Sequence, residues 1–456
     1  MIITLDFFDH FAIIYESLED KSPENIFKMW NEFYSNNKEE IKNFCLCDYE
    51  DEDVFSLFKE HLYPVFKNEW QEFYKAHKSL KTYGEEIKTW FKKKYEIDED
   101  IYFIYFVGIG SGAGAIGKYK NKHAIYFGIE QITKLKWYEK EKMISLIIHE
   151  LGHIFHFIKR EEKNLKYDYP DGDFIWRLYA EGFAERFKQN YKKSDCYIER
   201  FGGERIKWFE KNFSKLCVLY YEYMIQGKKE YDFYGDWYNI EGYSESAYYM
   251  GTKFIIFIEE KYNLDLTEIT YLTKEDMEKY FYEFIKVNSI GLAPGDVFLI
   301  SAYDFWKDLF EESKLEILEE MESEIVDIQH IGSTSVESLK AKPILDILIG
   351  IEKEKKDICI SKLQDLNFEY KGEFGIEGRE YFLKRKDGKT THHIHMVEYD
   401  SLLWKNHIKF RDVLINDNVM KEKYQQLKEK LSLDKTVSRE DYTKLKTSLI
   451  KEIMNN

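Results

Sequence analysis

Apolar and polar residues alternate with a helical period over most of the first 290 residues. Residues 23–95 carry aromatic side chains at helical spacing among charged ones, and residues 137–160 lack proline and place apolar residues on one broad face. The same period predicts helices over residues 174–189, 198–226 and 244–262. Around residues 101–129 the pattern changes to a β-hairpin, with residues 124–129 as its second strand. This region should therefore be mostly helical, with a small sheet.

The helix predicted over residues 137–160 contains His149, Glu150 and His153 in the pattern His-Glu-x-x-His. Two histidines four residues apart project from one helical face and can share a tetrahedral zinc ion. Glu150 leaves the same turn beside the metal's open position, where a carboxylate can take a proton from bound water. The alternative is that these are ordinary core and surface residues of an amphipathic helix.

A catalytic zinc ion needs a third protein ligand, and two candidates follow the histidine pair. His156 lies on the same face, but about 10 Å along the axis from His149, too far to share one ion on an unbroken helix. Glu181 lies on the next predicted helix, where the small residues Gly182 and Ala184 would let the two helices approach closely. We therefore prefer Glu181.

Together the two segments resemble the gluzincins, in particular a group of predicted bacterial zinc proteases with His-Glu-x-x-His and Glu-Gly-x-Ala-Glu. The resemblance implies that His149, His153 and Glu181 hold one Zn²⁺ and that Glu150 is the general base. Glu185, one turn after Glu181, would then have a supporting role.

A downstream helix of gluzincins often supplies a tyrosine or histidine that holds the tetrahedral oxyanion. Tyr248 and Tyr249 are candidates here, since the resembling proteases carry a similar Ala-Tyr-Tyr-x-Gly segment. Ordinary packing is the alternative role for either ring.

The glycine-rich stretch before the zinc helix matches a dinucleotide-binding fingerprint formally, over residues 112–117. That motif requires a helix after its glycines, whereas residues 118–129 predict a turn and a strand. A plain hairpin fits better. In zinc proteases the strand before the zinc helix commonly forms the sheet edge that pairs with an extended peptide, so residues 124–129 are expected at that edge.

The chain changes character near residues 288–296, where Pro294 and Gly295 break a helix. From residue 297 onwards it resembles the GrpB family. The resemblance is carried by Tyr303-Asp-x-Trp306, His330-Ile-Gly-Ser-Thr-Ser-Val336, Ala341-Lys-Pro-Ile-Leu-Asp-Ile347, Thr391-His-His-Ile-His395, Trp404-x-x-His407-x-x-Phe-Arg-Asp412 and Tyr424-x-x-Leu-Lys428. It implies a nucleotidyltransferase-like fold, with Gly-Ser on a turn and acidic residues on the next strand for Mg²⁺.

The residues fit that chemistry only in part. Gly332 and Ser333 could meet a phosphate, and Asp346 stands where the first metal-binding acid belongs. The second acid is replaced by Leu348, and the strand expected to carry a third contains histidines instead. Because two-metal phosphoryl transfer needs several carboxylates, nucleotidyl transfer is doubtful, and Mg²⁺ or another divalent ion here is left open. Candidate ligand-binding residues are Gly332, Ser333, Lys342, Asp346, Arg379, His393, His395 and Arg411, with Lys384 as a further phosphate partner and His330 as a further pocket residue.

Composition limits the function classes. The 456 residues carry a net charge of −17 with acids and lysines interleaved, which argues against an extended nucleic-acid surface. Five scattered cysteines (Cys45, Cys47, Cys196, Cys217 and Cys359) predict a reducing, cytoplasmic setting. The first ten residues show no secretion signal, and no membrane span is expected.

The sequence thus predicts an α+β protein of bacterial type with two domains. Residues 1–293 would form a mostly helical, gluzincin-like metallopeptidase with a small mixed sheet, acting on a peptide or protein. Residues 297–456 would form an α/β, nucleotidyltransferase-like domain that binds a nucleotide or another anionic small molecule. The rival interpretations are a nucleotidyltransferase or nucleotide-binding protein with a regulatory N-terminal domain, and a catalytically silent pair of domains that recognises a partner.

Overall fold

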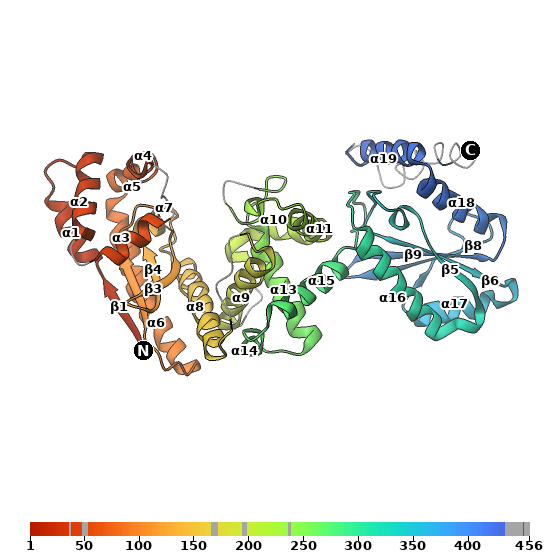
Figure 1. Cartoon of the computed structure of the whole chain (residues 1–456), viewed down its shortest axis with the longest axis horizontal. Coiled ribbons are helices and arrows are strands. Elements are labelled where there is room, and N and C mark those ends of the chain that lie inside the picture. The colour runs from red at the N-terminus through yellow and green to blue at the C-terminus, as the bar shows by residue number, and fades with distance from the viewer. Residues whose placement is uncertain are drawn as a thin grey trace. The chain divides into compact units, whose positions relative to one another are not determined.

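The computed structural model describes residues 1–35, 38–47, 53–110, 112–165, 172–193, 198–235, 239–433 and 450. Cys196 lies outside these residues. The chain divides into two compact units: residues 1–206 with 247–277, and residues 207–246 with 278–456 (Figure 1). The second unit therefore includes residues 207–246 and 278–293, which the sequence analysis had assigned to the first domain.

The first unit contains a four-stranded mixed sheet in the order β1-β2-β4-β3. Its strands are β1 (Ile2–Asp6), β2 (Ile101–Phe106), β3 (Ala115–Tyr119) and β4 (Lys122–Gly128). β1 and β2 are parallel, as are β2 and β4, whereas β3 and β4 form the antiparallel hairpin that the sequence predicted. The expected edge strand was wrong: β4 lies inside the sheet and β3 is the edge. β4 is buried along nearly its whole length, as a strand with neighbours on both sides should be.

Helices make up most of the rest of this unit. They are α1 (Phe8–Ser17), α2 (Pro23–Ser35), α3 (Glu39–Leu46), α4 (Val54–Leu57), a π-helical turn (Phe58–Leu62), α5 (Tyr63–Asn68), α6 (Trp70–Lys94), α7 (Ile129–Lys134), α8 (Lys140–Glu162), α9 (Phe174–Lys192), most of α10 (Ile198–Lys211), nearly all of α13 (Ser246–Tyr262) and α14 (Leu266–Ile269). The predicted helix over 198–226 is two helices, α10 and α11 (Phe213–Ile225).

Small residues let α9 approach two other helices closely. Gly152 of α8 lies against Ala184 of α9, where an added Cβ would be 3.0 Å from the Ala184 Cα atom. Gly182 does not face α8 as expected. It faces α13, where an added Cβ would overlap the carbonyl group of Gly251. α9 therefore packs between α8 and α13 with its backbone close to both.

The second unit contains a five-stranded sheet in the order β5-β6-β9-β8-β7. Its strands are β5 (Ile325–Ile331), β6 (Leu345–Ile351), β7 (Glu369–Tyr370), β8 (Arg379–Lys386) and β9 (Lys389–Glu398), and only β6 and β9 pair in parallel. Its helices are α11, α12 (Tyr231–Tyr234), most of α15 (Lys274–Asn288), α16 (Tyr303–Met321), α17 (Lys356–Asp365), α18 (Leu402–Asn416) and α19 (Asn418–Leu433). α16 packs on β5 and β6 through the face that carries His330, and α18 packs on the opposite face through Trp404.

Among the described residues, no helix is both long and apolar enough to cross a membrane. The mixture of helices with two small mixed sheets agrees with the predicted α+β class.

Candidate functional site

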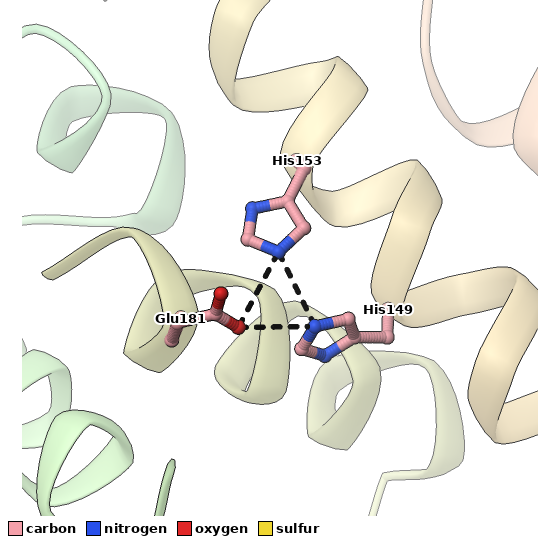
Figure 2. Close-up of side chains that lie close together, drawn as sticks. All are labelled: His149, His153 and Glu181. Atoms are coloured by element: carbon pink, nitrogen blue, oxygen red, sulfur yellow. Dashed lines mark hydrogen bonds and ion pairs between the residues drawn. The ribbon is translucent and has the colours of Figure 1, made fainter. Parts of the chain in front are cut away.

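The three side chains predicted as zinc ligands lie together in the first unit (Figure 2). His149 and His153 project from successive turns of α8, and Glu181 reaches them from α9. The two Nε2 atoms are 3.2 Å apart, and the Glu181 Oε2 atom lies 3.3 Å from His149 Nε2 and 3.6 Å from His153 Nε2. One nitrogen from each ring and one carboxylate oxygen thus point at the same space.

This triangle has the dimensions of a zinc site. Ligand atoms about 2.0–2.1 Å from a tetrahedral zinc ion lie about 3.3 Å from one another. The three observed separations fall on either side of that value. Glu181 Oε2 is also buried and has no hydrogen-bond partner among the described residues, although it points at two imidazoles. A metal ion would satisfy this oxygen, so the residues fit zinc.

Glu185, one turn after Glu181, supports His149 from the other side of the ring. Its Oε1 atom lies 3.1 Å from His149 Nδ1, and its Oε2 atom lies 2.5 Å from Lys188 Nζ. Zinc-binding histidines commonly use their second ring nitrogen in this way, which fixes the orientation of the ring. The supporting role of Glu185 was predicted from the sequence, whereas that of Lys188 was not. The only sequence signal for Lys188 is its position three residues after Glu185.

The charges of this cluster favour a cation at its centre. Burial lowers the pKa of His149, but the carboxylates of Glu181 and Glu185 outweigh it and raise that pKa to about 9. Burial raises the pKa of Glu181, but the neighbouring His153 and His149 hold it well below its ordinary range. The two carboxylates thus stabilise positive charge beside them, whether a proton or a metal ion supplies it.

Glu150, the predicted general base, is buried against a glycine-rich loop. An added Cβ on Gly114 would lie 2.9 Å from Glu150 Cγ and 3.0 Å from its Oε1 atom, so only glycine leaves the carboxylate this room. Gly114 directly precedes β3, which places the edge of the sheet beside the base. From the sequence, this loop was interpreted only as a dinucleotide-binding motif without the helix that such a motif requires.

A second buried carboxylate holds the same loop. Glu130 of α7 accepts hydrogen bonds from the backbone N–H groups of Gly108 and Gly110, at 2.7 and 3.3 Å. Its side chain is fully buried, and burial raises its pKa to about 7. Glu130 is therefore a structural group of the loop, and no pattern in the sequence indicated this role.

The two candidate tyrosines occupy different surroundings. The Tyr248 ring is half-buried, with its centroid 6.2 Å from that of His149. Tyr249 is buried, and Lys253 lies over its ring at 5.6 Å. The close crossing at Gly182 and Gly251 brings the first turn of α13, and with it Tyr248, to the cluster.

His156 takes no part in the cluster. Its ring is fully buried among Trp176, Tyr179 and Phe183, and its Nε2 atom lies 3.1 Å from the Tyr179 hydroxyl. It is a core residue.

The predicted residues of the second unit converge on Asp346. His393 is its register partner on β9, and its Nδ1 atom lies 3.1 Å from Asp346 Oδ1; His395 Nε2 lies 3.8 Å from the same oxygen. Arg379 Nη1 approaches the other nitrogen of His395 at 3.5 Å. Gly332 adopts φ +72° and packs so closely on Asp346 that a Cβ would overlap its carboxylate.

The electrostatics here differ from those of the first cluster. Burial raises the pKa of Asp346, but His393 and His395 outweigh it and hold this pKa well below its ordinary range. Burial lowers the pKa of His395 and brings that of His407, which lies beside it on α18, down to about 3. Asp346 is thus ionised, and burial favours the neutral form of the His395 imidazole beside it.

The side chains of Arg411, Lys384 and His330 make contacts elsewhere in the unit. Arg411 donates to Gln329 and the His330 carbonyl, and Lys384 pairs with Glu316. The His330 side chain lies on the opposite face of the sheet, stacked on Phe310. Lys342 is half-buried just before β6, and Ser333 lies in the turn after β5. Tyr381 and His407 also lie beside His395, although neither was selected from the sequence. The motif Trp404-x-x-His407 was the sequence signal for His407.

Comparison with known proteins finds a family match for the C-terminal part of the second unit. The family described as GrpB protein matches residues 296–456. The Glutamate-rich protein GrpB of Alkalihalophilus pseudofirmus is 32% identical over 171 residues, which cover 36% of this chain and 98% of that protein. The chain belongs to the GrpB family.

Further relatives agree. The UPF0157 protein YqkA of Bacillus subtilis is 37% identical over 153 residues, which are 33% of this chain and 44% of that protein. The crystal structure of the conserved protein GrpB from Enterococcus faecalis shares 32% identity and covers 35% of this chain and 95% of that one, with a TM-score of 0.32. The GrpB match begins at residue 296 and does not include the His149 cluster, whose assignment rests on its own geometry.

Proposed function

We propose that the first unit hydrolyses peptide bonds with a gluzincin-type zinc site. The observation that carries this proposal is the triangle of His149, His153 and Glu181 atoms, which has the dimensions of a tetrahedral zinc site, with Glu150 between the two histidines on the same helix. Such an ion would act as a Lewis acid that polarises the scissile carbonyl and lowers the pKa of a nucleophilic water to near neutrality.

The residues of the chain would then have separate tasks. His149, His153 and Glu181 hold the ion, and Glu185 keeps the His149 ring in place. The Glu150 carboxylate takes the proton of the attacking water and delivers it to the leaving amine. The Tyr248 hydroxyl, carried beside the cluster by α13, would donate to the developing oxyanion.

A peptide or protein is the expected substrate. β3 is the edge of the sheet and begins next to Gly114, which touches Glu150. An extended peptide that paired with β3 would run past the base. This supports an unfolded or flexible polypeptide as the class of substrate.

Metal analysis together with a base variant tests the proposal. The purified chain should hold zinc at the His149 site and cleave unstructured protein substrates. Glu150→Gln should keep the zinc and lose nearly all activity, because it removes only the base, whereas Glu162→Gln, at the exposed end of the same helix, should leave both unchanged. A chain that binds no zinc, or a Glu150→Gln variant with full activity, would reject the proposal.

For the GrpB-like domain we infer binding of an anionic small molecule, such as a nucleotide, without nucleotidyl transfer. Arg379 supports binding: it is buried beside His395, and its Nε atom has no hydrogen-bond partner among the described residues. Leu348 stands where two-metal catalysis needs a second acid.

Labelled nucleoside triphosphates with Mg²⁺ or Mn²⁺ test this second inference. We expect saturable binding that Ser333→Ala weakens, and no transfer of label. Label transfer that Asp346→Asn abolishes would establish the rival nucleotidyltransferase function. Absence of any nucleotide binding would reject nucleotides as the ligand.

A further inference from the structure

A second group of metal-binding side chains meets in the first unit, away from the His149 site. It consists of His123 on β4, Glu161 in the last turn of α8 and Glu99 just before β2. One ligand atom from each lies within 4.8 Å of the others. The three come from separate elements, so the fold brings them together and helical spacing does not.

The contacts show two carboxylates directed at one imidazole nitrogen. His123 Nε2 lies 3.1 Å from Glu161 Oε2 and 3.5 Å from Glu99 Oε1. The His123 side chain is only 4% exposed. Lys118 approaches the other oxygen of Glu161, at 3.6 Å.

One proton on His123 cannot satisfy both oxygens. An N–H bond on Nε2 points in one direction and serves the nearer acceptor, Glu161. Glu99 Oε1 is buried and has no hydrogen-bond partner among the described residues. A buried carboxylate oxygen in this state is unfavourable, and a divalent cation bound by all three side chains would remove the deficit.

We propose that His123, Glu99 and Glu161 form a second, structural site for a divalent transition-metal ion. One imidazole nitrogen and two carboxylate oxygens suit Zn²⁺ or Mn²⁺. The ion would tie the C-terminal end of α8 to the sheet and so fix the helix that carries His149 and His153. The site does not depend on peptidase activity and would exist in an inactive protein.

His77 provides the matched comparison. It lies close to two acids as well, with its Nε2 atom 2.7 Å from Asp6 Oδ2. There, however, Lys81 also approaches Asp6, Asp6 accepts from the Phe8 N–H group, and Asp9 is exposed. No carboxylate oxygen of that group is buried without a partner as Glu99 Oε1 is, so among the described residues it lacks the deficit that an ion would remove.

Zinc counting on the full chain tests the proposal. The protein is stripped with a chelator and dialysed against Zn²⁺, and bound metal is measured by mass spectrometry. His123→Gln should bind about one zinc ion per chain fewer than the unmodified protein, whereas His77→Gln should bind the same number. His149→Ala should remove a different zinc ion. The numbers of zinc ions lost in His149→Ala and in His123→Gln should therefore add in the double variant.

An unchanged zinc count in His123→Gln would overturn the proposal, as would an equal loss in His77→Gln, which would indicate non-specific binding. If His123→Gln fails to fold, the zinc affinity of the Glu99→Gln variant tests the site instead. The side chain at this position is 29% exposed and keeps its shape, so the fold should survive while zinc affinity at this site falls at least tenfold. Unaltered affinity in Glu99→Gln would reject the site. The experiment does not measure peptidase activity, so its failure and that of the proposed peptidase are distinguishable.

Discussion

Each unit contains a cluster of two histidines and one carboxylate, yet the two clusters are built differently. In the first, His149 and His153 are four residues apart on a helix, and their Nε2 atoms meet at 3.2 Å. In the second, His393 and His395 are two residues apart on a strand, where side chains on one face are roughly 6.7 Å apart. Among the described residues, the Asp346 cluster is not one of the groups whose ligand atoms all lie within 4.8 Å.

The groups next to the Nδ1 atoms of His395 and His149 reinforce that difference. Arg379 approaches His395 Nδ1 as a donor, so the Nε2 atom of a neutral His395 carries the proton and is not available to a metal. In the first cluster Glu185, an acceptor, occupies the equivalent place next to His149 Nδ1, which leaves Nε2 available. Identical residue types thus give a geometry that fits a metal ion in one fold and a hydrogen-bonded cluster in the other.

Removal of one histidine from each cluster should give the largest contrast. His153→Ala deletes a proposed zinc ligand, so we expect zinc affinity at that site to fall roughly a hundredfold or more. His395→Ala should leave the amount and affinity of bound zinc unchanged. Competition with a chromophoric chelator measures both. A similar loss in the two variants would show that the second cluster also binds zinc.

Substitution of a glycine beside each cluster should give the second-largest difference between the two clusters. Gly182→Ala places a methyl group against the Gly251 backbone, which cannot move aside as a side chain can. We therefore expect this variant to lose at least about 3 kcal/mol of stability and also to lose peptidase activity. Gly332→Ala should disturb Asp346 and leave zinc binding intact. Gly203→Ala is the control, because a Cβ there meets nothing within 4 Å. Denaturant titration measures the difference, and a neutral Gly182→Ala would show that α9 and α13 are less close than described.

The smallest expected effect is on the pH dependence of stability, through Glu130. Its pKa is raised from 4.5 to about 7 in the folded chain, so between these values the unfolded state loses its proton first. Stability should fall by between about 2 and 3 kcal/mol as the pH rises from 4.5 to 7, and the contribution of this group should level off within about one pH unit above that. Glu130→Gln should remove this part of the pH dependence, and the exposed Glu19→Gln should not. Identical profiles for the unmodified chain and Glu130→Gln would contradict the prediction.

The elements that sequence predicted well are those with strong local patterns. The helical period and the His-Glu-x-x-His motif located α8 and α9 to within a few residues, and the Glu181 motif gave the third member of the triangle. The partners of these elements were harder to predict. β1 pairs in parallel with β2 across almost 100 residues of sequence, and nothing local indicates that pairing.

Predictions of which neighbours a side chain contacts were wrong for the same reason. Gly182 was expected to face α8, but a small residue shows only that something lies close, and here that is α13. His330 was grouped with Asp346, but strand alternation puts it on the opposite face. Arg411 looked free for phosphate, yet Gln329 and the His330 carbonyl accept its hydrogen bonds.

The position of β3 at the sheet edge has a consequence for solubility. A strand that offers its backbone to a substrate offers it equally to a second copy of itself, and open edges of this kind start aggregation. β3 has only five residues, with Gly117 in the middle and the charged Lys118 exposed beside it. Short length, a glycine and a lysine all weaken pairing between identical strands. The same five residues would therefore admit a passing peptide and discourage self-association.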